Sequence, residues 1–452
     1  MSQSSFLQAL DKDVKGRVIR PSVAQERAFF GEYNRNIPLG IVEVADARDV
    51  STTVNAARDL GVPIAVRAGG HSVLGHSSPE GRLIIDLSRL KDIEIDLESR
   101  TAWAGGGVLA GEYTNATAEH GLVTGFGDTP TVGITGITLG GGVGLLHRKF
   151  GLTIDNLLAA KIVTADGAVR LVDELNEPDL FWALRGGGGN FGVITSLKYR
   201  LNPLDRVLGG MMILPADARV VANFVTATRE ASDGLSVIGG LTIAPPLPFI
   251  PSDVHGKLVI VGFMAHVGDP ETAEAEVAHF RRIATPLVDT VDAIPYTAMF
   301  EEGGPPQPVA IAQRSFFSDE LTPDIAESAI EALETSTAPM RIVQIRVLGG
   351  AVAEVPGDAT AFAHRDRAMI LNTAAAFENT EDREIHDDWV TRLRKSLQVG
   401  ADGVYINFHG DDSETAMRQA YPEGTWERLV AAKTEYDPDN LFSSNHNIPP
   451  RV

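Results

Sequence analysis

The chain has 452 residues, 44% of them hydrophobic, and it contains no cysteine. This length exceeds what one ordinary hydrophobic core serves, so two or more domains are expected. The lack of cysteine excludes disulfides, thiolate catalysis and cysteine metal ligands, and the formal net charge of −21 argues against nucleic acid or an anionic membrane as a partner.

No apolar run approaches the length of about 18 residues that a membrane span requires. The first residues, Met1 to Phe6, lack the basic and apolar parts of a secretory signal, so a cytoplasmic location is expected. The 45 glycines gather in clusters at 69–70, 105–107, 140–142 and 186–189. Such clusters between patterned strands indicate loops that press against a ligand.

The first strong signals are a helix and a strand that lead into a glycine loop. Asp46 precedes apolar positions spaced for one helix face, Gly61 suits the helix end, and a short apolar strand covers 64–66. The loop that follows reads Arg67-Ala68-Gly69-Gly70-His71-Ser72. Its glycines allow close approach to a bulky anion, and His71 adds a nucleophilic imidazole. The loop therefore predicts a phosphate-bearing cofactor that is covalently tethered.

Further elements are expected in chain order. Residues 83–85 and 93–97 read as strands, 110–120 as a helix and 121–144 as loop. Residues 162–172 read as a hairpin around Asp166-Gly167, and 193–201 as a long strand. The glycines at 105–111 imitate a dinucleotide fingerprint, but the last one is a residue late and no acid stands about 20 residues on, so a tight strand-to-helix turn is preferred over a nicotinamide-dependent dehydrogenase.

Two other glycine-rich segments are candidates for cofactor contact. Residues 131–144 are dominated by small and hydroxyl side chains, and their exposed N–H groups suit a pyrophosphate or the polar edge of a flavin. Residues 186–194 are either a second contact loop or a β-bulge entry. The histidines are dispersed without ligand spacing, so no metal site is expected.

The pattern of the sequence changes after residue 204, where glycine clusters become fewer. Residues 206–400 alternate amphipathic helices with strands, which predicts an antiparallel sheet covered by helices, with proline-rich loops at 245–251 and 303–308. Gln344 and Arg346 share one face of the strand 342–347. Tyr405-Ile406-Asn407-Phe408 reads as an alternating strand, in which Tyr405 and Asn407 are either a plain edge-strand pair or a phenolic base with a ligand-holding amide.

Together these segments resemble the FAD-linked oxidases of the berberine bridge enzyme type, in the vanillyl-alcohol-oxidase (PCMH-type) superfamily. The likeness is nearest to bacterial members of the 6-hydroxy-D-nicotine-oxidase-like kind. It covers nearly the whole chain, through 67–75, 131–144, 148–157, 179–193, 348–352 with 364–365, 405–408, 436–438 and 445–448.

The resemblance implies an α+β, two-domain PCMH-type FAD-binding fold with an antiparallel-sheet substrate domain. Residues 1–204 would form the first part of the FAD domain, 205–400 the substrate domain, and 401–452 a C-terminal segment completing the FAD domain. It also implies FAD bound covalently as an 8α-histidyl adduct of His71. Relatives with a second, cysteinyl link carry the cysteine before the Thr-Val-Gly segment, where this chain reads Gly127-Asp128-Thr129-Pro130, so a single link is expected.

The cofactor-binding residues expected on this basis are Arg67, Ala68, Gly69, Gly70, His71, Ser72, Gly75, His76, Thr131, Val132, Gly133, Thr135, Gly136, Gly140, Gly141, Gly142, Gly144, Asn156, Gly192, Val193, Ile194, Asn407, Asn445 and Asn447.

The resemblance further implies oxidation of a small-molecule alcohol, amine or secondary metabolite. A base removes a proton, a hydride passes to flavin N5, and O2 is the acceptor that gives H2O2. Tyr405 is the first candidate for the base, with Gln344 and Arg346 beside it, where some relatives carry a glutamate. Arg346 would bind an anionic substrate, lower the pKa of Tyr405, or pair with an acid across the sheet. A flavin dehydrogenase with another acceptor and a carbohydrate oxidase remain alternatives, and the oligomeric state is not predicted.

Overall fold

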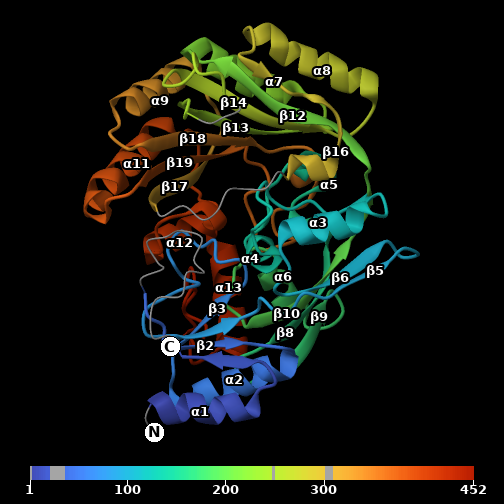
Figure 1. Cartoon of the computed structure of the whole chain (residues 1–452), viewed down its shortest axis with the longest axis vertical. Coiled ribbons are helices and arrows are strands. Elements are labelled where there is room, and N and C mark those ends of the chain that lie inside the picture. Colours follow the sequence, from blue (N-terminus) through green and yellow to red (C-terminus); the bar gives the residue numbers. More distant parts are fainter. Residues whose placement is uncertain (1–2, 21–35, 247–249, 301–308, 452) are drawn as a thin grey trace.

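The computed structural model describes residues 3–20, 36–246, 250–300 and 309–451. The expected loop at 303–308, and part of the one at 245–251, lie outside these residues. A lower half built from two small sheets carries an upper half built around one large sheet (Figure 1). In the described residues, no helix combines the length and apolarity needed to cross a membrane.

The lowest layer is a four-stranded sheet flanked by two helices. Its strands, in the order β1-β2-β4-β3, are β1 (Arg17–Ile19), β2 (Gly40–Glu43), β4 (Leu83–Asp86) and β3 (Ile64–Arg67), and the helices are α1 (Gln3–Asp13) and α2 (Ala47–Leu60). The Asp46 side chain accepts hydrogen bonds from the first turn of α2, and Gly61 ends the helix in the left-handed region at φ 63. Both predicted helix boundaries and the strand before the glycine loop are therefore confirmed.

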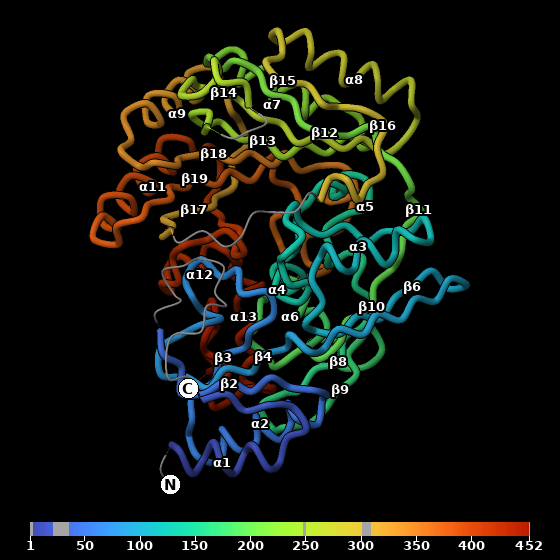
Figure 2. Tube along the Cα trace, in the orientation of Figure 1, coloured from blue at the N-terminus to red at the C-terminus, as the bar shows by residue number. Residues whose placement is uncertain are grey.

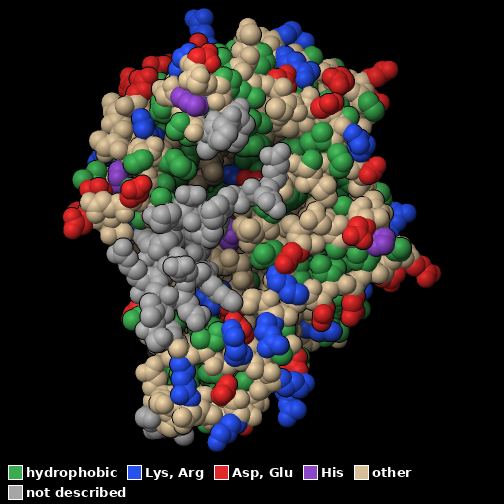
Figure 3. Space-filling view, viewed as in Figure 1, with side chains coloured by type: hydrophobic (Ala, Val, Ile, Leu, Met, Phe, Trp, Pro, Cys, Tyr) green, Lys and Arg blue, Asp and Glu red, His purple; other side chains and the backbone are tan. Residues whose placement is uncertain are grey.

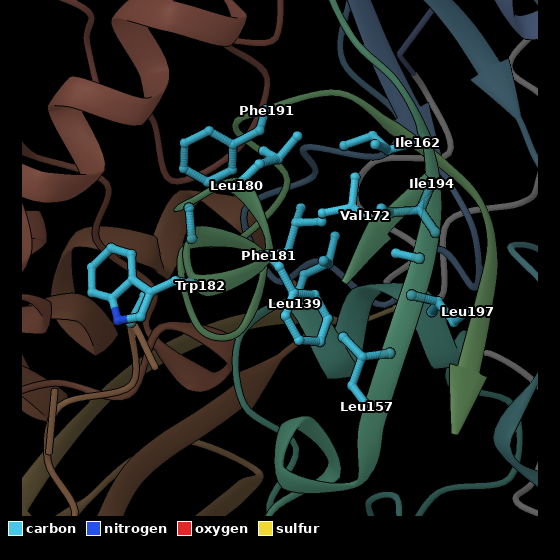
Figure 4. Packing of buried hydrophobic residues seen from close by; sticks show 14 of the residues in the cluster. Leu139, Leu157, Ile162, Val172, Leu180, Phe181, Trp182, Phe191, Ile194 and Leu197 are labelled. Atoms are coloured by element: carbon cyan, nitrogen blue, oxygen red, sulfur yellow. The ribbon is translucent and has the colours of Figure 1, made fainter. Parts of the chain in front are cut away.

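The second layer is a five-stranded antiparallel sheet. Its order is β5 (Ile93–Asp96), β6 (Thr101–Gly105), β10 (Val193–Arg200), β8 (Leu157–Val163) and β9 (Val169–Asp173). The β8–β9 pair is the hairpin predicted around Asp166-Gly167. Apolar side chains of β8 and β10 pack against α6 (Pro178–Leu184), with Phe181 and Leu139 at the centre of the cluster (Figure 4). This core holds the segments on either side of it in fixed positions.

The upper half is an eight-stranded antiparallel sheet, as the sequence predicts. Its strands are β12 (Arg206–Pro215), β13 (Leu235–Ile243), β14 (Leu258–His266), β15 (Val288–Asp289), β16 (Asp292–Pro295), β17 (Ala310–Ser318), β18 (Met340–Val347) and β19 (Met369–Phe377). The helices α7 (Ala218–Glu230), α8 (Pro270–Ile283), α9 (Pro323–Thr335) and α11 (Arg383–Leu397) lie on its outer side (Figure 1). The other face of the sheet is turned toward the lower half.

The remaining helices, strands and turns lie outside these three sheets. They are α3 (Ala110–Ala118), β7 (Leu122–Val123), α4 (Ile134–Leu139), α5 (His147–Phe150), β11 (Asn202–Pro203), α10 (Ala351–Glu354), α12 (Glu414–Ala420), α13 (Glu423–Tyr436), and 3₁₀ turns at Thr153–Asn156, Tyr296–Met299, Thr380–Asp382 and Ile406–Phe408. The helix predicted over 110–120 thus ends two residues early.

Two predictions of secondary structure were wrong. Residues 121–144 are not all loop, because Ile134 and Leu139 are buried apolar residues that anchor the short helix α4 among the glycines. Residues 405–408 form a 3₁₀ turn instead of a strand. The Ser315 hydroxyl accepts from the Tyr405 N–H and donates to its carbonyl oxygen, while the Phe408 N–H closes the turn on that same carbonyl.

The C-terminal segment returns to the lower half and runs beside the N-terminal strands (Figure 2). Lys433 on α13 is 0% exposed, as is its partner Asp437. The Lys433 ammonium also donates to the carbonyl oxygens of Asn190 and Phe442. Lys433 therefore connects α13 by hydrogen bonds to the glycine loop at 186–190 and to the segment that precedes residues 444–446.

Replacing Lys433 with methionine should destabilise the folded protein by about 3–5 kcal/mol, because a buried Asp437 carboxylate is left without its cation. The measurement is chemical unfolding of the purified protein. Arg428→Gln is the matched control, since Arg428 lies on the same helix but forms a solvent-exposed pair with Asp179. That variant should lose less than about 1 kcal/mol. Equal losses in the two variants would contradict this account of the buried pair.

Candidate active site

A cavity of about 660 Å³ lies between the glycine loops of the lower half and the inner face of the large sheet. The lower side is formed by parts of 64–77, 127–143, 188–189 and 442–446, and the upper side by parts of 242–245, 311–313, 339–346 and 372–376. Residues 405–408 lie where the two sides meet. The space-filling view is hollowed at mid-height, between the two halves of the molecule (Figure 3).

The loop after β3 is held at its base by a buried ion pair. Arg67 and Asp86 end two paired strands, and their side chains meet at 2.7 Å. Gly69 then packs directly on Gly133, since a Cβ at position 69 would lie 2.2 Å from the Gly133 nitrogen. Gly70 takes a φ of 79, which disfavours any residue with a side chain. The backbones of the two glycine-rich loops are thus in direct contact at one wall of the cavity.

His71 lies next to this contact between the loops and lines the cavity. Its Nε2 makes a 3.1 Å hydrogen bond with the Thr131 hydroxyl of the facing loop. Burial lowers the pKa of His71 to about 4, and a weaker hydrogen bond that the ring donates to the Thr131 backbone opposes this fall. The imidazole is therefore neutral at physiological pH and keeps the lone pair that a nucleophile needs.

Several polar groups near His71 have no hydrogen-bond partner among the described residues. Within the described part of the chain, the N–H groups of Gly69, Gly70 and Ser72 donate to no acceptor. Buried side-chain atoms without partners include Ser77 Oγ and Asn445 Oδ1, from segments that line the same wall. Converging N–H groups at a glycine loop are a typical anion site. This wall is therefore suited to a polar, negatively charged ligand.

Tyr405 and Asn407 come together at the far end of this wall. The Tyr405 hydroxyl oxygen accepts hydrogen bonds from the Gly142 N–H at 3.0 Å and from Asn407 Nδ2 at 2.9 Å. Burial raises the pKa of Tyr405, which is 1% exposed, while these two donors and the charge of Arg346 oppose the rise. The predicted proximity of Tyr405 and Asn407 holds even though the segment is not a strand.

Gln344 and Arg346 line the upper side of the cavity and are joined by a 3.0 Å hydrogen bond from Arg346 Nη1 to Gln344 Oε1. Arg346 Nη2 is 2.8 Å from Asp128 of the opposite wall. The arginine pairs with an acid, but not across the sheet as one predicted alternative had it, because Asp128 lies in a loop of the lower half. Against the effect of burial, the charge of Arg346 does lower the pKa of Tyr405, as a second alternative predicted.

Comparison with known proteins places this chain in a family. Two family models match the chain, "FAD binding domain" over residues 38–173 and "Berberine and berberine like" over 404–449. The FAD-linked oxidoreductase YvdP of Bacillus subtilis (strain 168), itself uncharacterized, is 30% identical, covering 96% of this chain and 98% of that protein. The chain belongs to the berberine bridge enzyme-like family of FAD-linked oxidoreductases.

Other members of the family agree in sequence and structure. The (R)-6-hydroxynicotine oxidase of Paenarthrobacter nicotinovorans is 29% identical over 91% of each chain. The crystal structure of 6-hydroxy-D-nicotine oxidase from Arthrobacter nicotinovorans superimposes with a TM-score of 0.84 at 25% identity, covering 97% of this chain and 98% of that one. The protein is therefore an oxidoreductase with the α+β, PCMH-type fold that the sequence predicts.

The residues of this FAD-linked oxidoreductase fit the FAD that its family binds. The glycine loop at 69–72 offers N–H groups to a pyrophosphate. The unpartnered atoms of Ser77, Asn445 and His446 supply polar contacts along the same wall. The same cavity is also lined by His71 and Tyr405.

The predicted site residues divide into two groups. Those that line the cavity are Ala68, Gly69, Gly70, His71, Ser72, His76, Val132, Gly133, Thr135, Gly136, Gln344, Arg346, Tyr405, Asn407 and Asn445. Those that do not are Arg67, Gly75, Thr131, Gly140, Gly141, Gly142, Gly144, Asn156, Gly192, Val193, Ile194 and Asn447.

Most members of the second group have packing or positioning roles. A Cβ on Gly144 would lie 1.5 Å from the Phe126 carbonyl oxygen, and one on Gly192 would lie 2.4 Å from that of Val163. These glycines therefore allow backbones to touch each other. Asn156 donates to the carbonyl oxygens of Phe150 and Leu152, so its amide bridges a local turn. Thr131 acts through His71, and Gly142 through Tyr405.

Sequence reasoning missed several residues on the cavity wall, notably Asp128, Gln313 and Asn372. Strand alternation offers a signal for Asn372, because it lies opposite Gln344 in the register of β18 and β19. No signal in the sequence places Asp128 beside Arg346. Among the described residues, no group of three histidine or acidic side chains is placed to hold a metal ion.

Proposed function

We propose that this FAD-linked oxidoreductase is an oxidase that carries its FAD on His71 through a single 8α-histidyl bond and oxidises a small organic substrate. The observation that carries the proposal is the position of a neutral imidazole on the cavity wall that also reaches Tyr405. When bound, FAD supplies an isoalloxazine ring that takes a hydride equivalent from the substrate and returns the electrons to dioxygen, giving hydrogen peroxide.

His71 is suited to the tether by its charge state and its fixed orientation. A pKa near 4 keeps the imidazole neutral at physiological pH, and the hydrogen bond between Nε2 and the Thr131 hydroxyl orients the ring. No second tether can form through sulfur, because the chain has no cysteine. Residues 444–446 face the same cavity from the C-terminal segment, which supports a cofactor domain completed by residues 401–452.

Tyr405 is the proposed base. Its oxygen already accepts two hydrogen bonds, which stabilise a phenolate, and its own proton has no acceptor among the described residues. The proton is therefore free to point into the cavity, where a substrate hydroxyl or amine would lie. Asn407 fixes the phenol by bonding both Tyr405 and the Ile137 carbonyl oxygen. The substrate would be a small molecule enclosed between the two halves.

The test needs no known substrate. The purified protein is expected to be yellow and to keep its flavin in the pellet after acid precipitation. After anaerobic reduction with dithionite, mixing with air-saturated buffer should restore the flavin absorbance within seconds and release an equivalent of peroxide, measured with a peroxidase-coupled dye. Flavin in the acid supernatant would refute the tether. Reoxidation by a dye but not by air would instead identify a dehydrogenase.

A further inference from the structure

The inner face of the large sheet forms one wall of the cavity, here called its floor. The part of the cavity beside Tyr405 and Arg346 is called the substrate end, because the proposed function places the substrate next to Tyr405. On β18, Ile342, Gln344 and Arg346 point to the cavity, and the residues between them, Val343 and Ile345, pack into the core beneath the helices. This alternation is what an extended strand requires. The cavity-facing side chains of neighbouring strands therefore form rows that can be read from the register.

The rows change from polar to apolar along the strands. Arg346 is at the inner end, and next to it Gln344 lies opposite Asn372. One step further out, Ile342 lies opposite Ala374, which in turn lies opposite Gln313. The outermost row holds Met340, Ala376 and Ile311. A ligand on this floor therefore meets Arg346 and amides at one end and mostly small or aliphatic side chains at the other, where Arg341 also borders the cavity.

The polar end has hydrogen-bonding capacity that the protein does not use. Arg346 and Asn372 are each 2% exposed, yet Arg346 Nε and Asn372 Oδ1 have no partner. Gln344 Oε1 accepts from both neighbours, and within the described residues its Nε2 donates to no protein atom. Unpaired buried polar atoms are costly, so these atoms bind a partner from outside the protein, either ordered water or a ligand that displaces it. The missing partner is chiefly an acceptor, since Arg346 Nε and Gln344 Nε2 are both donors.

The guanidinium of Arg346 is fixed where it would bind such an acceptor. It stacks on the Phe408 ring, 4.4 Å from the centroid, and its Nη atoms are held by Gln344 and Asp128. Asp128 is the one carboxylate among the described residues that line the cavity, and Arg346 already neutralises it. A cationic amine would meet this guanidinium without a free carboxylate to offset the repulsion.

We propose that Arg346 determines specificity by binding an acceptor oxygen on a flat, apolar substrate, such as the carbonyl, phenolate or carboxylate oxygen of an aromatic compound. Cationic amines and saccharides are then poor ligands. The proposal rests on the proposed function for its choice of the substrate end of the cavity. It concerns binding only, so it is tested without turnover.

The test titrates the purified holoenzyme with three probes, following flavin absorbance and, independently, heat of binding. The probes are 2-naphthoate, 2-naphthylmethylamine and cellobiose, which vary the head group and the body. Naphthoate is expected to bind at least about tenfold more tightly than the amine, and Arg346→Gln to weaken it by about tenfold or more, because a charge-assisted hydrogen bond is lost. Cellobiose should give no saturable signal.

Arg341→Gln is the matched control. Arg341 also lines the cavity, but it lies five positions earlier on the same strand, at the opposite end, and its guanidinium is bound to the carbonyl oxygens of Leu333 and Ala338. Removing this charge should change naphthoate affinity by less than about twofold, since screening weakens distant charges. Equal losses in the two variants would mean that long-range charge, not contact with Arg346, holds the probe, and would overturn the proposal.

Asp128→Asn is a second variant that keeps the arginine. Removing the competing carboxylate should tighten naphthoate by about threefold or more, because one like charge near the bound anion is lost. Tighter binding of the amine than of naphthoate, or unchanged naphthoate affinity in Arg346→Gln, would refute the proposal. Flavin content and acid stability are measured on the same samples. A protein without covalent flavin but with this probe ranking would refute the tether alone.

Discussion

Replacing His71 with alanine should leave a folded protein from which all flavin is released by acid. The reason is that the His71 imidazole lines the cavity, is kept neutral by burial, and is oriented by Thr131 where the two glycine loops touch. The measurement is flavin absorbance in pellet and supernatant after acid precipitation, with a peptide digest to locate the flavin mass on the peptide that contains residue 71.

Two variants separate the tether from other effects. His76→Ala removes a second imidazole from the same loop, one that faces Asp412 at 3.5 Å, and should keep acid-stable flavin at the wild-type level. Thr131→Val removes the hydrogen bond to His71 Nε2 and should slow attachment without preventing it. If His76→Ala released the flavin and His71→Ala did not, the tether assignment would be wrong.

The charge state of His71 gives the same prediction a pH dependence. Burial lowers its pKa to about 4, so the neutral form that can act as a nucleophile predominates above that pH. Incorporation of added FAD into flavin-free protein should therefore be independent of pH from neutrality down to about pH 5 and decline as the pH approaches 4. A decline centred near pH 6.5 would show that the imidazole is solvated instead of buried.

Features encoded within a few neighbouring residues could be predicted from the sequence. Asp46 and Gly61 mark the ends of α2 because each satisfies backbone groups next to it in the chain. The hairpin at Asp166-Gly167 and the approach of the His71 loop to a cavity follow from equally local signals. Of the four glycine clusters, 69–70 and part of 186–189 line the cavity and 105–107 and 140–142 do not, because the same residue type serves two purposes. Gly69 and Gly70 line the cavity, whereas Gly144 and Gly192 allow two backbones to touch each other.

Features that depend on distant segments could not be predicted. Asp128 and Arg346 are 218 positions apart and meet only because the two halves close over one cavity. Residues 405–408 alternate like a strand, yet they form a turn. The side chain of Ser315, which is 90 positions away, stabilises this turn by hydrogen bonding to the Tyr405 backbone. In both cases a tertiary hydrogen bond overrides or completes the local pattern. The chemistry of the substrate end arises from such contacts.

Replacing Tyr405 with phenylalanine should lower kcat by roughly 10²- to 10⁴-fold, the usual contribution of a positioned acid or base. The ring contacts with Phe362 and Phe408 survive this change, so folding and flavin content should match the wild type. The measurement is the rate of anaerobic flavin reduction by any substrate that a peroxide screen identifies. Tyr421→Phe is the control, because it removes another buried hydroxyl, bonded to the Gly186 carbonyl oxygen, from outside the cavity lining.

The environment of the phenol also predicts the form of the pH profile. Burial raises the pKa of Tyr405, so the ionised base is a minor species at neutral pH and the rate should increase as the pH rises toward that pKa. The Gly142 N–H and Asn407 Nδ2 donate to the phenol oxygen, so they partly oppose the rise in the pKa of Tyr405. Asn407→Leu removes one donor and should move the rising limb to higher pH, whereas Tyr405→Phe should abolish it. A rate that stays within tenfold of the wild type in Tyr405→Phe, with the limb unchanged, would place the base on another residue, and the position of the limb would then identify its pKa.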